Sequence, residues 1–381
     1  MNNKRINNSF KNKFSNKKYI MIILVILILY VYFHSGINYL PVEEVGVPSG
    51  IGNDISDDEF SVPMSIYNYG SDKKITRFIH TGVSDTIAGT RENRQLLSNK
   101  DFKLGHERII ISSEKLARFG IINWVNIVFK NPNINDTALI AVTKEETKEI
   151  LSYNVPEYPS AADYIADMIE SSTEFNFFSD NYKLMDIFVR LDAEGRNIVL
   201  PYIELENGKL KITGMALFKK DKMVKKIDIN DSRIMNILRE NKVKGILALK
   251  ESSKKYISYY TITKRNVKCE RRNGKYYFTI NVVLNGEIVE NKMFKDIRSN
   301  KETMQKFETY MSKHVEKMCY NFIKNMQNDY KVDCLELGRV AAAKFGRHTG
   351  VDWDEIITDR NKTEIKVNVN VKVKKMGRGD Y

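Results

Sequence analysis

The sequence predicts a mixed α+β and α/β protein. We expect an N-terminal transmembrane helix and then a three-domain ectodomain, in which each domain is a β-sheet flanked by helices. Three observations lead to this fold class. One uninterrupted apolar run extends from Ile20 to Phe33. Beyond it, helical and strand patterns alternate without an internal repeat. With 42% hydrophobic and 29% charged residues, the composition is that of a globular protein and not of a disordered one.

The apolar run decides whether the N-terminal segment is an anchor or a cleaved signal. No Lys, Arg, Asp or Glu occurs between Lys18 and Glu43. The run itself spans roughly 21 Å as a helix, and a continuation to Leu40 would cross a hydrocarbon core of about 30 Å. No small-residue cleavage site follows the run, and a lipoprotein signal needs a cysteine, which does not occur before Cys269. We predict an uncleaved transmembrane anchor over residues 19–41, with a cleaved signal as the main alternative.

The charges that flank the run predict its orientation. Six basic residues and no acidic residue precede it: Lys4, Arg5, Lys11, Lys13, Lys17 and Lys18. Because positive flanks stay in the cytoplasm, residues 1–18 are predicted to be cytoplasmic and the chain beyond residue 42 to lie outside. These six residues carry almost half of the net charge of +13, so the ectodomain is only mildly basic. Such a surface fits anionic lipid headgroups, and no nucleic acid partner is expected.

The first predicted domain, residues 42–195, is of the α/β type. Gly50-Ile51-Gly52 is interpreted as a turn. Ile109 to Ile111 predict a short buried strand, and Ser112 or Ser113 then caps a helix that ends at Gly120. The other elements expected here are a strand over 59–70, a helix from Ser84 or Asp85 to about Lys100, a helix over 121–132, a strand over 137–143, and helices at about 144–153, 160–171 and 181–193.

The second predicted domain, residues 196–255, is a small α+β unit. Three strands are joined by tight turns at 206–208 and 219–222, and Asn207-Gly208 between apolar runs is a strong hairpin signal. Asn230 or Asp231 is expected to cap a helix that runs to Glu240. A strand over 245–250 completes the unit.

The third predicted domain, residues 256–381, is an α+β unit with a long helix and a final strand. Its meander is expected to turn at 272–274 and at Asn285-Gly286. A helix over 301–329 is followed by a second helix over 334–345 that ends at Gly346. The long helix carries one apolar stripe, interpreted as core: Met304, Phe307, Met311, Val315, Met318, Phe322 and Met326. The final strand alternates apolar and polar residues from Ile365 to Val373, as in a half-buried strand of an antiparallel or mixed sheet.

Residue patterns for catalysis, cofactors or metals are few. The five histidines are scattered without metal-ligand spacing: His34, His80, His106, His314 and His348. The three cysteines form no C-x-x-C pair, so folding should not depend on disulfides: Cys269, Cys319 and Cys334. The chain contains no G-x-S-x-G elbow, P-loop or H-E-x-x-H motif, and Gly50-Ile51-Gly52 lacks the third glycine of a dinucleotide loop.

Two carboxylate clusters and one serine pair are the remaining candidates. The segments DISDDE, residues 54–59, and DWDE, residues 352–355, could bind a cation, but solvated loops are the favoured interpretation. Ser112-Ser113 could supply a nucleophile, but helix capping accounts for it. We therefore predict no catalytic, cofactor-binding or metal-binding residue, and a binding or structural protein in place of an enzyme.

Three stretches resemble one known family, the Ger(x)C proteins, which are the C subunits of nutrient germinant receptors in endospore-forming bacteria. They are residues 105–144, 200–224 and 351–377, and they occur in the family's order and spacing. The resemblance covers nearly all of the chain beyond residue 42. It implies a three-domain ectodomain, no catalytic site and no cofactor. It also implies two partners in the spore inner membrane, a polytopic A subunit and a transporter-like B subunit.

The chain departs from this family at the membrane anchor. Family members carry a lipobox cysteine that is acylated, whereas the corresponding region, residues 33–36, contains no cysteine. No lipidation site is therefore predicted. A single-pass transmembrane helix is expected to retain the protein at the spore inner membrane or cell membrane in place of a lipid.

Two classes of function follow. The first is a non-enzymatic, membrane-anchored receptor subunit needed for the response to nutrient germinants, acting in assembly or signal transmission. The second is a membrane-anchored exported enzyme such as a cell-wall hydrolase. A buried Asp or Glu pair with raised pKa in a large cleft would favour the second class. No interface residues are predicted.

Overall fold

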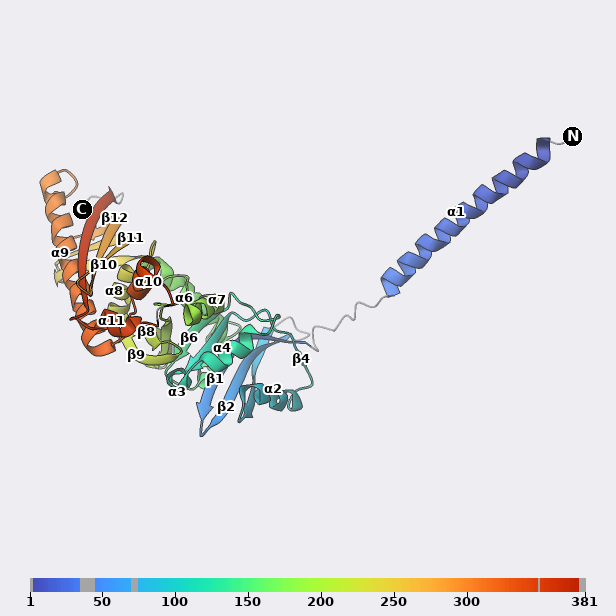
Figure 1. Ribbon diagram of the computed structural model, residues 1–381, viewed down its shortest axis with the longest axis horizontal. Helices are drawn as coiled ribbons and strands as arrows, with labels where there is room; N and C mark the ends of the chain where they lie inside the picture. Colours follow the sequence, from blue (N-terminus) through green and yellow to red (C-terminus); the bar gives the residue numbers. More distant parts are fainter. Residues whose placement is uncertain (1–2, 35–44, 70–74, 349, 377–381) are drawn as a thin grey trace. The chain divides into compact units, whose positions relative to one another are not determined.

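The computed structural model describes residues 3–34, 45–69, 75–348 and 350–376. They belong to two compact units, Met1–Val45 and Gly46–Tyr381. The first unit contains helix α1, and the second contains almost all of the remaining structure (Figure 1). The predicted mixed fold class with an N-terminal apolar helix is confirmed.

Helix α1 extends over Asn3–His34. Within it, residues 17–34 are long and apolar enough to cross a membrane, and they are the only such segment among the described residues. Every side chain from Tyr19 to Phe33 is exposed. A cleaved signal would show the same properties, so the anchor over 19–41 stays a prediction. Its last part, residues 35–41, lies outside the described residues.

The bounds of the other elements follow the chain. The strands are β1 Val45–Ser56, β2 Glu59–Tyr69, β3 Ile75–Ser84, β4 Asp101–Phe102, β5 Ile109–Ser113, β6 Leu139–Thr143, β7 Val199–Glu206, β8 Lys209–Lys219, β9 Lys222–Asp228, β10 Lys244–Ser252, β11 Lys255–Arg272, β12 Lys275–Asn291 and β13 Thr363–Met376. The helices are α2 Ile87–Leu96, α3 Glu114–Phe119, α4 Ile122–Phe129, α5 Thr147–Ser152, α6 Ala161–Phe175, α7 Leu184–Asp192, α8 Ile229–Arg239, α9 Lys301–Asn325, α10 Leu337–Phe345 and α11 Trp353–Thr358, with a π-helical turn at Met326–Tyr330.

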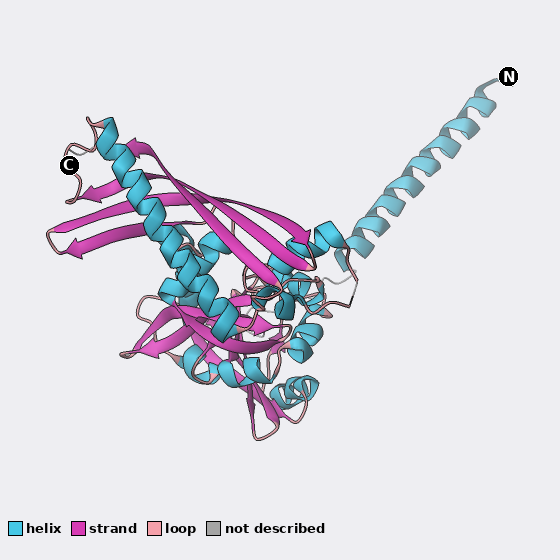
Figure 2. Cartoon of the chain, turned by 60° about the vertical axis from the view of Figure 1, so that its left-hand side comes forward, coloured by secondary structure: helices cyan, strands magenta, loops and turns pink. Residues whose placement is uncertain are grey.

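Two sheets organise the second unit (Figure 2). The larger has the order β3-β2-β1-β5-β6-β7-β8-β9, with β4 beside β1, and its central strands β1, β5, β6 and β7 are parallel. The smaller has the order β10-β11-β12-β13 and is mixed, because β13 pairs parallel to β12. The strands expected in a separate middle sheet are divided: β7–β9 extend the larger sheet and β10 begins the smaller. Strand pairing does not itself draw domain boundaries, and the divisions at 195 and 255 stay predictions.

The turn predicted at Gly50-Ile51-Gly52 is wrong, because these residues lie within β1. The glycines are explained by close packing. A Cβ on Gly50 would lie 2.5 Å from Cβ of Ala162, and a Cβ on Gly52 would lie 2.2 Å from Oγ1 of Thr147. Only the absence of a side chain at these two positions lets α5 and α6 approach the sheet this closely.

The turn predicted at Asn285-Gly286 is also wrong. Strand β12 continues through it to Asn291, and Gly286 pairs with Thr261 of β11. A Cβ on Gly286 would lie 1.9 Å from the carbonyl oxygen of Tyr260, so this glycine allows the two strands to approach. The other Asn-Gly predictions are confirmed: Asn207-Gly208 and Asn273-Gly274 have positive φ and connect β7 to β8 and β11 to β12.

Helix ends differ from the prediction where a neighbouring side chain caps better. Ser113 caps α3 and Gly120 ends it, as predicted. Helix α8 begins earlier than predicted, because the Asp228 side chain accepts the N–H of Asp231. Helix α2 is capped by Thr86, one residue beyond the predicted positions.

Helix α9 lies across the smaller sheet and forms much of its core (Figure 2). Five of the seven stripe residues are buried, and the other two, Met304 and Met318, pack against them. The same helix also covers the free edge of β13. Four backbone N–H groups of that edge donate to α9 side chains four residues apart: Val367 to Tyr320 Oη at 3.1 Å, Val369 to Glu316 Oε1 at 2.9 Å, Val371 to Ser312 Oγ at 3.0 Å and Val373 to Glu308 Oε1 at 2.8 Å. Every second backbone N–H group on the outer edge of β13 therefore has a side-chain acceptor from α9.

Candidate functional site

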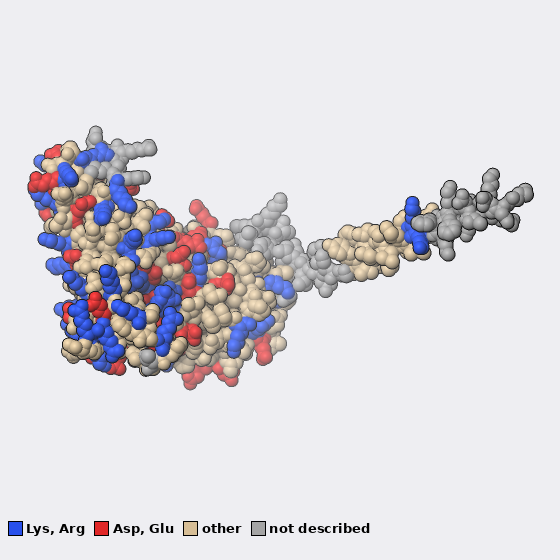
Figure 3. All heavy atoms as spheres, turned by 45° about the horizontal axis from the view of Figure 1, so that its top comes forward, with Lys and Arg blue, Asp and Glu red and all other residues tan. Residues whose placement is uncertain are grey.

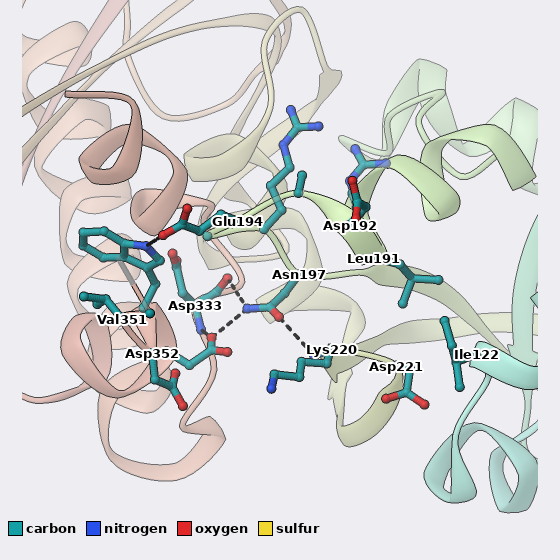
Figure 4. Close-up of a pocket in the computed structure, with 17 residues that line it drawn as sticks. Ile122, Leu191, Asp192, Glu194, Asn197, Lys220, Asp221, Asp333, Val351 and Asp352 are labelled. Atoms are coloured by element: carbon teal, nitrogen blue, oxygen red, sulfur yellow. Dashed lines mark hydrogen bonds between the residues drawn. The ribbon is translucent and has the colours of Figure 1, made fainter. Parts of the chain in front are cut away.

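A cavity of about 490 Å³ lies where segments from five parts of the chain meet (Figure 4). Its walls come from Ile122 at the start of α4, the end of α7 and the loop after it, the β8–β9 turn, Asp333, and the chain at 350–354. Six carboxylates line it: Asp192, Glu194, Asp221, Asp333, Asp352 and Asp354. Three cationic residues line it as well: Arg190, Arg196 and Lys220.

Two of these carboxylates are buried and bonded to the backbone. Asp354 Oδ1 accepts the backbone N–H of Asp333 at 2.7 Å and the side-chain amide of Asn197 at 2.6 Å. Asp333 Oδ1 accepts the N–H of Leu335 at 3.1 Å, and its Oδ2 accepts the N–H of Gly338 at 2.7 Å. Asp333 thereby takes the place of a side-chain cap at the start of α10. The pair ties three distant segments together.

Burial changes the acidity of both groups. Removal from water raises the pKa of Asp333 to about 7; the N–H of Gly338 works against this shift, and the nearby charge of Asp354 adds to it. Burial also raises the pKa of Asp354, although the N–H of Asp333 and the amide of Asn197 oppose the increase. Asp333 is 1% exposed and Asp354 8%.

The raised pKa of Asp333 predicts a loss of stability with rising pH. Because the pKa rises from 3.8 to about 7 on folding, the folded chain holds one more proton than the unfolded chain between these values. Stability should therefore fall by about 2–3 kcal/mol between about pH 5 and pH 8 from this group alone. Urea unfolding at both pH values measures the free energy of unfolding. In Asp333→Asn, the decrease in this free energy between the two pH values should be smaller by that amount, even if the variant is less stable at both. Asp57→Asn, in an exposed turn, is the control. An unchanged slope in Asp333→Asn would contradict the prediction.

Next to the cavity, Glu336 forms ion pairs with four arginines. Oε1 of Glu336 is 2.7 Å from Arg239 and 3.3 Å from Arg190, and Oε2 is 3.4 Å from Arg196 and 3.5 Å from Arg339. Burial by itself would raise the pKa of Glu336, but the charges of Arg239, Arg196 and Arg190 lower it to about 2. Arg239 is fully enclosed and also donates to the carbonyl oxygens of Cys334 and Asn197.

Sequence reasoning missed this cluster and Asp333. The four arginines come from α7, the loop after it, α8 and α10, and no local pattern joins residues so far apart. Glu336 itself has a positive φ of 55° immediately before α10, a conformation that a single sequence does not reveal for glutamate. The one available signal was the pair of isolated acidic residues between apolar ones in the segment Val332 to Leu337.

The two carboxylate clusters considered from the sequence lie in different places, and only one of them reaches the cavity. Asp352 and Asp354 of the DWDE segment both reach the cavity. Asp352 caps α11 through the N–H of Glu355 at 3.1 Å and pairs with Lys219 at 3.2 Å. Asp54 of the DISDDE segment lies elsewhere, buried, and accepts the N–H of Thr147 at 3.0 Å; burial raises its pKa. Among the described residues, no group of three or more His, Cys, Asp and Glu could hold a metal ion.

The histidines, cysteines and serines remain apart from the cavity or have structural roles. His80 packs against Phe78 and Phe102, and the backbone N–H of His348 donates to Glu194 of the cavity at 2.7 Å. The three cysteines are buried and free. Ser113 caps α3, whereas the hydroxyl of Ser112 is buried. The structure thus offers carboxylates as the site's chemistry, and most of their contacts are with backbone N–H groups.

Comparison with known proteins identifies the family. Residues 38–205 match the model of the spore germination protein N-terminal domain, and residues 213–377 match the spore germination B3/GerAC-like C-terminal domain. The chain belongs to the GerAC family of spore germination proteins. The resemblance inferred from three stretches of sequence is thereby confirmed for most of the chain.

Relatives of this GerAC-family chain agree with that assignment. It is 26% identical over 285 residues to spore germination protein GerQC of Bacillus cereus, covering 74% of this chain and 77% of the relative. It is 24% identical over 259 residues to spore germination protein A3 of Bacillus subtilis, covering 65% and 68%. The crystal structure of the GerBC protein superimposes with a TM-score of 0.55 over 85% of this chain and 96% of that chain, at 16% identity. This likeness supports the fold. The GerAC-family chain is therefore a spore germination protein of the germinant receptor C-subunit type.

Proposed function

We propose that this protein is a non-enzymatic, membrane-anchored subunit of a germinant receptor, acting with the A and B subunits in assembly or signal transmission. The observation that carries the proposal is the pair of family matches, which together extend from residue 38 to residue 377. Helix α1 supports a membrane location, and the six basic residues before its apolar part support a cytoplasmic N-terminus. The spore inner membrane is the location that the family implies.

The bonding at the cavity supports a role without catalysis. A general acid or base must reach the proton that it transfers, and a carboxylate with its oxygens occupied by backbone N–H groups does this poorly. Both oxygens of Asp333 accept backbone N–H groups. Asp354 Oδ1 accepts two donors, one of them the backbone N–H of Asp333. These contacts fix the segment before β7, the start of α10 and α11 relative to one another.

One observation favours the alternative of an exported hydrolase. Asp333 and Asp354 form a buried carboxylate pair with raised pKa beside a large cavity, which is the arrangement that acid–base catalysis uses. The alternative needs one of these groups to act on a substrate. Replacement of Asp354 by asparagine tests this directly, because the amide oxygen can still accept from Asp333 and Asn197.

Germination of a deletion strain tests the proposal. Spores that lack the protein should not respond to one set of small nutrients, but should germinate when triggered downstream of the receptor. Full-length chains carrying Asp354→Asn, or Asp352→Asn as the matched control, should both restore the nutrient response. Immunoblots of spore membranes check that each variant is present. If the anchor is not cleaved, the protein from these membranes should also retain its N-terminal peptide. If Asp354→Asn reaches the membrane at the normal level yet matches the deletion, while Asp352→Asn restores the response, the hydrolase alternative replaces the proposal.

A further inference from the structure

Among the described residues, no helix packs over the middle of one face of the smaller sheet. Helix α6 reaches only its end, where the ring of Phe175 lies 5.9 Å from that of Tyr260. The other face of the sheet packs on α8, α9 and α10 through the buried residues of β11, β12 and β13. Strand pairing places the uncovered side chains in rows across β11, β12 and β13. We define the open sheet face by three such rows: Lys268, Thr279 and Lys366; Asn266, Asn281 and Asn368; and Lys264, Val283 and Asn370. Lys372 lies at the next position of β13 on the same face, opposite Asn285.

Four lysines of this face carry unopposed charge. Lys264, Lys268, Lys366 and Lys372 are all exposed, and none of them forms an ion pair with a described residue. Two carboxylates on the same face already have partners: Glu270 pairs with Arg272, and Glu364 with Lys275. A third, Glu287, lies two positions beyond Asn285 on β12, at the Lys372 end of the face. In Figure 3, Lys and Arg are numerous over the left-hand half of the second unit, interspersed with Asp and Glu.

The centre of the open sheet face is flat and uncharged. Thr279, Asn281 and Val283 are half-buried, and the amide of Asn368 donates to Oδ1 of Asn281 at 2.8 Å. None of the cavities described for this structure includes these residues. Strand spacing puts the β11 lysines about 10 Å from those of β13, and Lys264 about 13 Å from Lys268. Charges spread this widely over a flat surface suit an extended anionic surface better than a single small anion.

We propose that the open sheet face binds a surface of anionic lipid headgroups. This inference rests on the membrane anchor of the proposed function, since the anchor would hold the ectodomain close to lipid at high effective concentration, where weak attraction of each lysine suffices. Asparagine and threonine side chains can donate to headgroup phosphates between the lysines. The exposed Ile262, paired with Lys244 at the margin of the face, offers an apolar contact to the same interface.

The length of the connecting chain permits this contact. The predicted anchor ends at residue 41 and β1 begins at Val45. The three residues between them can span at most about 10 Å when extended. With this anchor inserted, the start of β1 therefore stays close to the bilayer surface.

The test uses the full chain reconstituted in lipid vesicles. A membrane-impermeant amine reagent, added outside, modifies exposed lysines of outward-facing ectodomains, and mass spectrometry measures the modified fraction at each. In vesicles with roughly one third anionic lipid, modification of Lys264, Lys268, Lys366 and Lys372 should fall at least about threefold relative to neutral vesicles. High salt should restore it, because salt screens these exposed charges. Four other exposed lysines should not change: Lys115, Lys130, Lys148 and Lys209.

Charge variants separate lipid binding from other causes. Lys275, at the margin of the face, should also be protected from modification in anionic vesicles at low salt. Exchange of the four face lysines for glutamine should abolish this protection of Lys275. The same exchange at the four control lysines should leave the protection intact. Flotation with neutral vesicles tests the anchor independently, since it does not depend on the face. A chain that floats but shows equal modification in neutral and anionic vesicles overturns the inference and leaves the proposed function standing. Protection that arises only when a receptor partner chain is added, whatever the lipid, assigns the face to a protein and also overturns it.

Discussion

Replacement of Glu336 by glutamine is expected to destabilise the second unit by about 3–5 kcal/mol, because buried arginines lose a carboxylate partner. Glu336 is the only ion-pair partner of Arg190 among the described residues, whereas Arg239 keeps Glu240 at 3.0 Å. The Arg239 side chain is fully enclosed and lies 2.7 Å from Glu336. Arg190 and Arg196 lose the same partner. Glutamine keeps the shape of the side chain but removes the negative charge. Urea unfolding of the full chain at neutral pH measures the difference.

An exposed ion pair supplies the control. Glu355 pairs with Lys362 at the surface, and Glu355→Gln should cost less than about 1 kcal/mol. The pH dependence gives a second readout. Since the pKa of Glu336 is lowered to about 2 in the folded chain, its contribution is present above pH 4.5 and is lost as the pH falls toward 2. Glu336→Gln should lack that acid loss. A cost equal to that of the control would show that the arginines do not depend on Glu336.

One residue inserted after Asn368 should unfold the smaller sheet. Beyond the insertion, Val369 and Val371, which are buried, would turn to the solvent face, because side chains alternate with a period of two. Each buried valine contributes roughly 1.5–3 kcal/mol, so the loss approaches the total stability of a typical domain. The insertion would also displace the N–H groups that donate to Ser312 and Glu316. Thermal unfolding followed by circular dichroism measures the effect.

The same insertion placed ahead of the strand is the matched control. Arg360 lies in the exposed turn between α11 and β13, and one residue after it can be absorbed without a change of register. This variant should unfold within a few degrees of the unaltered chain, since about 1 kcal/mol shifts the midpoint by only a few degrees. If both insertions behave alike, β13 is not held in register by its buried face.

Features that repeat within a short segment were predictable from the sequence. The alternation from Ile365 to Val373 gives β13 and its buried side, and the stripe from Met304 to Met326 gives the core face of α9. Asn207-Gly208 marks its turn because few other pairs accept two positive φ values. In each case the physical cause lies within the segment itself.

Features that depend on a distant partner were not predictable. Gly286 looks like a turn residue, but the carbonyl oxygen of Tyr260 is what excludes a side chain there. Strand β7 joins β6 through the pairing of Val142 with Tyr202. No local sequence pattern around either residue indicates that these two strands are neighbours. At the cavity, the DWDE segment stood out because its acids are adjacent, whereas Asp333 and Glu336 acquire their properties from burial and from arginines of other elements.

The pairing of β13 with β12 also determines how late in synthesis the smaller sheet can be completed. Tyr276 of β12 pairs with Thr363 of β13. Thr363 is therefore made 87 residues after Tyr276. Until then β12 has an unpaired edge, and the α9 side chains that will accept the N–H groups of β13 have nothing to accept. A chain released before residue 376 is made would therefore expose the long unpaired edge of β12. Retention of the nascent chain by a chaperone up to its last residues would protect this half of the protein from aggregation.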